Sequence, residues 1–365
     1  MNNIKTRKSP SRSFGRKYWN KPDRVAYLFM LPSILVLFVF AIIPLMACLV
    51  ISLFDMNIFF TDTSFTGTHN FITAFQDTRF WNALLNTVIF VLFEVPLQIV
   101  IGLLTANALV KTSLFNKAAR SIFFLPVVCS MAAVGIIWSI LLDTNIGFIP
   151  YLLEQIGIHN ATFFRNAKTA MPTVIAMTVW KNFGYTMSIL VVGIQGISQS
   201  YYEASEIDGA GKTAQFFKIT LPLLKPTLGF CLITNTIGSL QVFDQVYVTT
   251  QGGPQFKTET LVQYIYKTGF NQPYNLGYAC ALSVLLLVVI LAVSLPMYKN
   301  MFINQNLHDG NEQCEKRRKR IWLCLHLTKF GFGFFHRAKP VTEMERQRNR
   351  GALRTDGKSE TGGRG

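Results

Sequence analysis

Six long runs of apolar residues constrain this chain more than any other feature of its sequence. Roughly 20 residues suffice to cross a bilayer, and the runs lie at about 25–54, 83–109, 119–142, 170–197, 225–248 and 276–300. Hydrophobic residues make up 50% of the 365 residues and the mean hydropathy is +0.31, which is too apolar for an ordinary soluble domain of this length. The sequence therefore predicts an all-α, polytopic membrane protein with about six transmembrane helices.

The basic residues lie mainly at the two ends of the chain and in short loops. The formal net charge of +16 could suggest a nucleic-acid partner. The distribution of the charges is better explained by the positive-inside rule and by anionic lipid headgroups. We therefore expect contact with the lipid bilayer and no nucleic-acid partner. The same rule predicts that both termini and the loop at 198–224 face the cytoplasm.

Two basic segments flank the apolar region. Residues 1–24 form the first, and residues 306–365 form a second, which ends in a polar stretch rich in glycine and arginine. An apolar patch at 321–335 could lie in the membrane interface, because it combines Trp322 and phenylalanines with nearby bases. A disordered cytoplasmic tail is the simpler interpretation, and we adopt it.

Signatures of enzymes, metal sites and disulfide frameworks are missing from the sequence. The six cysteines include no C-x-x-C pair, so neither a zinc site nor a disulfide framework is indicated. We find no nucleophilic triad and no phosphate-binding G-x-x-x-x-G-K-[ST] sequence. We therefore expect this chain to be no enzyme and to hold no metal or cofactor of its own.

The connector between the fourth and fifth apolar runs is unusually patterned. It reads EASEIDGAGKTAQFFKITLPLLKP over residues 203–226. The pattern predicts a short helix at 203–207, a backbone turn at Gly209 and a second helical segment that begins with an apolar knob at Phe216 and Phe217. Pro222 and Pro226 then limit the helix and redirect the chain. Such a unit suits docking to a cytoplasmic partner, although an ordinary connector remains the alternative.

This connector resembles the EAA loop of the permease subunits of bacterial binding-protein-dependent ABC importers, and we name residues 198–226 the EAA loop. Ser205 replaces the commoner alanine, and the family's usual aromatic near Thr213 is missing. Segments at 27–45, 249–270 and 277–286 agree with the carbohydrate-uptake branch, and the resemblance covers about residues 24–305. The matching residues are Glu203, Ala204, Asp208, Gly209, Ala210, Phe216, Ile219, Thr220, Leu221, Pro222 and Pro226.

The resemblance implies a six-span type I ABC permease domain at 25–305 in the bacterial cytoplasmic (inner) membrane. The chain would be one subunit of an ATP-driven sugar importer and would form half of the translocation pathway. Its partners would be ABC ATPase subunits, which bind the ATP, a second and usually different permease, and an extracytoplasmic solute-binding protein. The residues implied to couple to the ATPase are Glu203, Ala204, Ser205, Asp208, Gly209, Ala210, Phe216, Leu221 and Pro222.

Polar side chains within the fourth and fifth apolar runs are candidates for the solute pathway. Polar groups are costly in a membrane, so each one suggests a function, and the resemblance places solute-facing residues on these same two spans. Hydrogen bonding between helices uses the same residue types and is the alternative explanation. The candidates are Asn182, Tyr185, Asn235, Ser239, Gln241 and Asp244.

Three charged residues stand out inside the apolar runs. Glu94 lies in the second run, Lys181 in the fourth and Asp244 in the fifth. A charge at mid-membrane costs roughly 2.5–3.5 kcal/mol on the insertion scale, so we expect Lys181 to pair with Asp244 or Glu94. The alternative is that Lys181 reaches the membrane interface.

Two other functions compete with the importer. An ion-coupled secondary sugar transporter would use acids within the spans, but neither broken spans nor a repeat is evident from the sequence. A membrane anchor or receptor would bind a cytoplasmic partner without transport. The sequence does not name the solute, and mono- and oligosaccharides or glycerol phosphate all remain open.

Overall fold

A computed structural model of the chain describes residues 21–59, 63–158, 162–272 and 274–303. The chain divides into two compact units, residues 1–42 with 312–365 and residues 43–311. The predicted basic N-terminus lies outside the described residues except for its last four positions. The predicted tail at 306–365, with its interfacial patch, lies outside them entirely.

The described part of the first unit is one apolar helix. Helix α1 (Lys21–Leu37) continues into a π-helical turn, η1 (Phe38–Ile42). Large apolar side chains on it are exposed, among them Phe29 at 79% and Phe40 at 71%. Exposure of this kind along a whole helix fits a lipid environment rather than water.

Four helical segments are long and apolar enough to cross a membrane. They are Phe29–Ile51, α4 (Thr78–Leu109), α8 (Ala170–Gln195) and Leu276–Met301, which contains α15 (Leu276–Tyr298). Two further segments qualify as bent pairs of helices, which gives up to six spans in the part of the chain that the structure describes. The predicted all-α, polytopic class is confirmed.

The expectation of unbroken spans is wrong. The third apolar run folds as α5 (Leu114–Val128) and α6 (Met131–Leu141), which are bent by 95°. Pro126 in the last turn of α5 lacks the N–H that a continuing helix needs, and Cys129 is extended. The other pair is Lys212–Leu223 with α12 (Lys225–Leu240), bent by 66°.

The fifth span also ends earlier than the sequence predicts. Helix α12 ends at Leu240, and Asp244 begins a separate short helix, α13 (Asp244–Thr249). A carboxylate in the first turn of a helix is favourable because it faces the positive end of the helix dipole. Asp244 is therefore not a charge within a continuous span.

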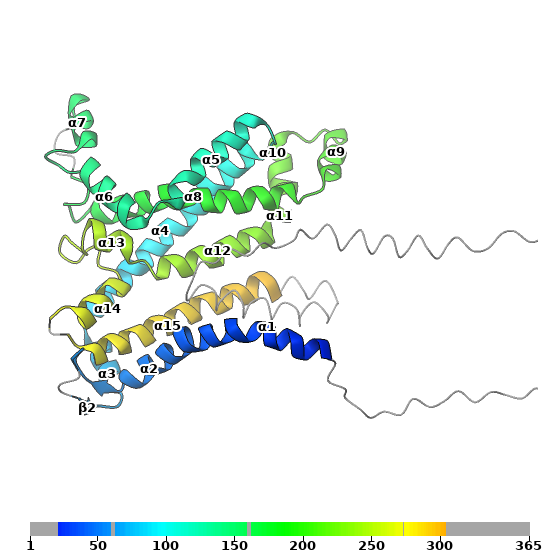
Figure 1. The fold of residues 1–365 in the computed structure, drawn as a ribbon. Coiled ribbons are helices and arrows are strands. Elements are labelled where there is room, and N and C mark those ends of the chain that lie inside the picture. The colour runs from blue at the N-terminus through cyan, green and yellow to red at the C-terminus, as the bar shows by residue number, and fades with distance from the viewer. Residues whose placement is uncertain (1–20, 60–62, 159–161, 273, 304–365) are drawn as a thin grey trace, which may run out of the picture. The chain divides into compact units, whose positions relative to one another are not determined.

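The second unit is a helix bundle in which α4 and α8 make the most extensive contact (Figure 1). Helix α12 packs against α4, α8 and α15. One buried cluster includes Phe90 and Val174, a second Met187 and Leu224, and a third Leu261 and Leu282. Packing of these clusters fixes the paths of the central helices relative to one another.

Side chains form hydrogen bonds with backbone groups at both ends of α4. At its start the carboxylate of Asp77 accepts from the backbone N–H of Arg79 at 2.8 Å. At its end the guanidinium of Arg120 donates to the carbonyls of Leu109 and Val110 at 2.9 and 3.1 Å. Both devices pair backbone groups that a helix terminus leaves unmatched. Arg120 thereby holds the start of α5 against the end of α4.

Helices α5 and α8 approach so closely that Gly184 is required. A Cβ built on Gly184 would lie 2.1 Å from the backbone oxygen of Phe123. No side chain could be accommodated there without moving α5 away from α8, because the obstructing atom belongs to a backbone.

The remaining elements are short. The only strands in the described residues are β1 (Phe54–Asp55) and β2 (Ser64–Phe65), an antiparallel pair. Short helices outside the EAA loop and not yet described are α2 (Ile43–Ile51), α3 (His69–Gln76), α7 (Phe148–Gln155), α14 (Leu261–Phe270) and the π-helical η3 (Lys299–Ile303). The EAA loop contains α9 (Gln199–Ile207), α10 (Lys212–Gln215), η2 (Phe216–Thr220) and α11 (Leu221–Leu223).

Candidate functional site

The EAA loop forms a helix–turn–helix at one end of the bundle (Figure 1). Helix α9 covers the predicted helix at 203–207, and the chain then turns at Gly209, whose φ is +79°. The backbone N–H groups of Gly209 and Ala210 donate to the carbonyls of Glu206 and Ser205 at 3.1 and 2.9 Å. Glycine is favoured here because side-chain-bearing residues rarely adopt this left-handed conformation.

A hydrogen-bonded brace inside the loop joins its two helical arms. The buried amide of Gln215 donates to the hydroxyl of Ser205 at 3.0 Å, and Ser205 donates to the carbonyl of Tyr202 at 2.7 Å. The hydroxyls of Tyr202 and Thr220 lie 2.9 Å apart. Ser205 therefore stabilises the loop from within, and its predicted part in coupling stays a prediction.

Most of the predicted coupling residues lie on the loop surface. Glu203, Ala204, Asp208, Gly209 and Pro222 are exposed, whereas Ala210, Phe216 and Leu221 are half-buried. Exposed residues of the loop are accessible for contact with another protein.

The exposed apolar surface of the loop includes Ile207 as well as the predicted Phe217. Ile207 is 88% exposed and Phe217 60% exposed, while Phe216 packs against Phe217 with ring centroids 5.1 Å apart. Ile207 was missed because the motif gave it no role beyond continuing the helix. Its position, four residues after Glu203, was the available signal, since residues i and i+4 share a helix face.

An ion pair spans the turn. Lys212 Nζ lies 2.5 Å from a carboxylate oxygen of Glu206, and this hydrogen bond lowers the pKa of Glu206 below its ordinary value. Both side chains are well exposed, so the pair contributes little to stability.

Two of the predicted pathway residues make hydrogen bonds between helices. Asn235 on α12 and Gln98 on α4 both donate to the hydroxyl of Thr186 on α8, at 3.1 and 2.9 Å. Ser239 on α12 donates to the buried carboxylate of Glu94 on α4 at 2.5 Å. These contacts match the alternative explanation, in which polar groups hold spans together.

The other four pathway candidates are half-buried or exposed. Tyr185 on α8 is 44% exposed, Asn182 is half-buried, and Gln241 and Asp244 are exposed. Their role in solute passage stays a prediction.

The expected pairing of Lys181 with a carboxylate is wrong. Lys181 is 8% exposed, and its ammonium group donates to the carbonyl of Val127 at 3.4 Å. None of the ion pairs within the described ranges involves Lys181. Because the α5–α6 break leaves carbonyls near the end of α5 unmatched, a nearby cation finds a partner in the backbone instead.

A buried ion cluster that the sequence did not indicate lies near the other end of the bundle. The carboxylate of Glu259 is fully buried and accepts from the guanidinium of Arg79 at 2.8 Å twice and from Lys267 at 2.9 Å. Burial opposes ionisation of Glu259, but the hydrogen bonds from Arg79 and Lys267 outweigh it and lower its pKa. The cluster ties the segment at 249–260 to α4 and α14.

Comparisons with known proteins match most of this chain to transport permeases. The sequence profile of the family described as "Binding-protein-dependent transport system inner membrane component" matches residues 98–299. The probable ABC transporter permease protein YurN of Bacillus subtilis is 34% identical over 285 residues, which cover 77% of this chain and 97% of YurN. The lactose transport system permease protein LacF of Rhizobium radiobacter is 34% identical over 289 residues, which cover 78% of this chain and 95% of LacF.

A solved structure agrees with the sequence comparisons. The crystal structure of a bacterial ABC transporter involved in the import of the acidic polysaccharide alginate contains a chain similar to this one, with a TM-score of 0.67 and 25% identity. The match covers 77% of this chain and 96% of the alginate transporter chain. The similarity therefore extends over nearly the whole of that chain.

Proposed function

This chain belongs to the family of inner membrane components of binding-protein-dependent transport systems, and on that premise we propose that it is the permease subunit of an ATP-driven ABC sugar importer. It is a multi-pass membrane protein of a transport family, not a catalytic domain. In the proposal it lines half of the translocation pathway. A saccharide is the favoured solute class because LacF is a lactose permease and the similar solved transporter imports alginate.

One observation carries the mechanistic part of the proposal. The EAA loop is a braced helix–turn–helix whose exposed residues include Glu203, Ile207, Asp208 and Phe217. A rigid unit with apolar anchors and flanking carboxylates can seat in a groove of another protein, where the anchors supply affinity and the charges supply orientation.

The energy source in this proposal is a separate ATPase subunit. The chain has no phosphate-binding G-x-x-x-x-G-K-[ST] sequence, so we assign ATP binding and hydrolysis to a partner. Closure of the ATPase subunits would move the EAA loop, and the loop would move α8 and α12, between which it lies in the chain. A second, related permease would supply the other half of the pathway, and an extracytoplasmic protein would deliver the solute.

Membrane orientation follows from the docking role. An ATPase works in the cytoplasm, so we place the EAA loop on that side, in agreement with the positive-inside rule. With six spans both termini are then cytoplasmic. The loops at 142–169 and 241–275 consequently face the opposite side.

A secondary carrier is the weaker candidate. The bent pair α5–α6 resembles the discontinuous helices of such carriers, so the expected absence of broken spans no longer argues against it. Family membership and the EAA loop still favour the importer, and a carrier leaves that loop without a role.

The testing experiment is purification of the tagged chain from native membranes in mild detergent, followed by mass spectrometry and reconstitution into proteoliposomes. We expect an ABC ATPase and a second permease to co-purify and sugar uptake to require ATP. Gly209→Asp and Glu203→Lys should block uptake while leaving membrane insertion intact. Uptake driven by an ion gradient, or normal ATP-driven uptake in both variants, would contradict the proposal.

A further inference from the structure

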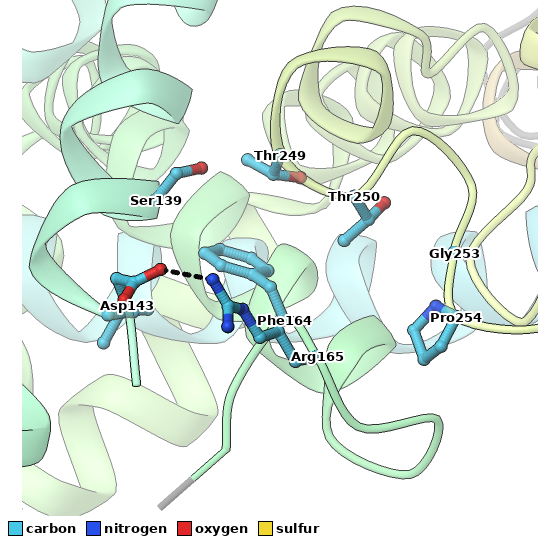
Figure 2. A pocket seen from close by; sticks show the side chains of 9 residues that line it. Ser139, Asp143, Phe164, Arg165, Thr249, Thr250, Gly253 and Pro254 are labelled. Carbon is cyan, nitrogen blue, oxygen red and sulfur yellow. Dashed lines mark hydrogen bonds and ion pairs between the residues drawn. The ribbon is translucent and has the colours of Figure 1, made fainter. Parts of the chain in front are cut away.

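A pocket of about 450 Å³ lies at the end of the bundle away from the EAA loop. Its size is within the range of about 300–1,000 Å³ that is usual for small-molecule sites. Three segments form it, namely the end of α6, the loop that contains Phe164 and Arg165, and the segment that follows α13. Figure 2 shows the Phe164 ring between the Asp143–Arg165 pair and the hydroxyls of Ser139 and Thr249. None of these residues belongs to the pathway candidates on α8 and α12.

The acidic wall of the pocket is held in place before any ligand arrives. One carboxylate oxygen of Asp143 accepts from the backbone N–H of Asn145 at 2.9 Å, and the other accepts from Arg165 at 2.9 Å. The hydrogen bond from Asn145, together with weaker ones from Ile146 and Arg165, lowers the pKa of Asp143. Asp143 is therefore an ionised acceptor at neutral pH. Because its geometry is fixed in advance, a ligand loses little free energy in ordering it.

Arg165 supplies donors to the same pocket. Its side chain is 62% exposed, and one of its nitrogens donates to Asp143. A guanidinium carries five N–H donors in a planar fork, so several remain to be shared with a ligand or water. Arg165 and Asp143 together offer a donor and an acceptor side by side.

The hydroxyls of the pocket act as acceptors. Ser139 donates to the carbonyl of Gly135 at 2.8 Å, and Thr249 donates to that of Gln245 at 2.6 Å. Each hydroxyl has a single proton, so its lone pairs remain to receive a hydrogen bond. Thr250 is less available, since its hydroxyl is already paired with Thr258 at 2.7 Å.

We propose that this pocket is a saccharide-binding subsite that receives a disaccharide before it reaches α8 and α12. The lining combines a partly exposed aromatic ring with a charged acceptor, a charged donor and accepting hydroxyls. A pyranose has an apolar C–H face and a rim of hydroxyls that both donate and accept, so it complements each of these groups. The inference rests on the proposed import of sugars and deepens it by naming a solute contact outside the spans.

The test is equilibrium binding to the purified complex in lipid nanodiscs without any solute-binding protein. Radiolabelled lactose and maltose are the probes, and glycerol 3-phosphate tests whether the site instead selects an anion. We expect saturable binding of a disaccharide. Arg165→Ala should weaken it by about tenfold, the effect of losing one charged hydrogen bond. Lys168→Ala, which removes an exposed cation of the same loop outside the pocket, is the matched control and should have no effect.

A second measurement does not depend on the Arg165 variant. Thr249→Cys places a thiol in the pocket, and we expect lactose or maltose to slow its reaction with a maleimide, as quantified by mass spectrometry of the labelled peptide. The proposal is overturned if no disaccharide binds, if only glycerol 3-phosphate binds, or if Arg165→Ala and Lys168→Ala have equal effects. If ATP-driven sugar uptake persists in any of these cases, the importer function is still supported and only the subsite is rejected. If the unmodified complex shows no uptake at all, both the importer function and the subsite are contradicted.

Discussion

Gly209 offers a sharp test of the EAA loop, because its backbone conformation can be separated from its lack of a side chain. Its φ of +79° lies in the left-handed region, which costs a residue with a Cβ roughly 1–2 kcal/mol. A Cβ built there would meet no other atom within 4 Å. The whole cost of Gly209→Ala is therefore backbone strain. Gly209→Ala should lower the ratio of loops with the native turn to loops with a distorted turn by a factor of about 5–30.

Gly211 is the matched control for this change. A Cβ at Gly211 also meets nothing within 4 Å, but the φ of Gly211 is not in the left-handed region. Gly211→Ala adds the same methyl group to the same loop without strain, so we expect it to be nearly neutral. Gly209→Asn should fall between the two, because asparagine tolerates the left-handed conformation better than alanine does.

The assay is ATP-driven uptake in proteoliposomes, together with retention of the ATPase during purification. We expect both to fall in the order Gly211→Ala, Gly209→Asn, Gly209→Ala. Membrane insertion should stay the same in all three. Equal losses in Gly209→Ala and Gly211→Ala would show that the turn is not what matters, and full activity in Gly209→Ala would refute the role of the loop geometry altogether.

Three further expectations follow from the structure. Ser205→Ala should lower the stability of the loop by about 1 kcal/mol, because it removes the nearer of two acceptors of the buried Gln215 amide. Hydrogen exchange at 199–220 should then speed up, and unchanged exchange would contradict the brace. Glu259→Gln should lower the melting temperature by weakening charged hydrogen bonds worth about 1.5–3 kcal/mol. The pKa of Glu259 is lower in the folded state than in the unfolded state. The ionised carboxylate therefore stabilises the fold fully above the unfolded pKa of about 4.3, and this stabilisation is lost as the pH falls through the folded pKa. The fall in melting temperature on acidification should consequently be smaller in the variant than in the parent. Gly184→Ala should lower the free energy of unfolding by about 3 kcal/mol or more by forcing α5 from α8. Gly238→Ala, which meets nothing within 4 Å and lies in α12, should not lower the melting temperature.

Residue patterns that act locally were readable in the sequence. Apolar runs of bilayer length predicted the membrane-spanning segments, because a helix in lipid satisfies its backbone hydrogen bonds within its own segment. The turn at Gly209 and the helix before it were predicted for the same reason, since a left-handed turn favours glycine at that one position. The order of residues in the EAA loop also indicated the family, which the comparisons confirmed.

Signals for the broken third span were present but too weak to interpret alone. Pro126 and Ser130 flank the break, yet proline is common in membrane helices and does not always interrupt them. The 95° bend between α5 and α6 depends on the packing of α5 against α8 as well. That packing in turn depends on Gly184, which lies more than fifty residues further along the chain.

Partners of the polar side chains were decided only by the tertiary structure. Apolar patterning determined that this chain would span a membrane and which segments would lie in it, because hydrophobicity acts on each segment separately. It could not show that Lys181 meets the carbonyl of Val127 rather than a carboxylate, or that Asp143 and Arg165 line a pocket with Thr249. A hydrogen bond needs donor and acceptor within about 3 Å, and only the packing of distant segments sets such distances.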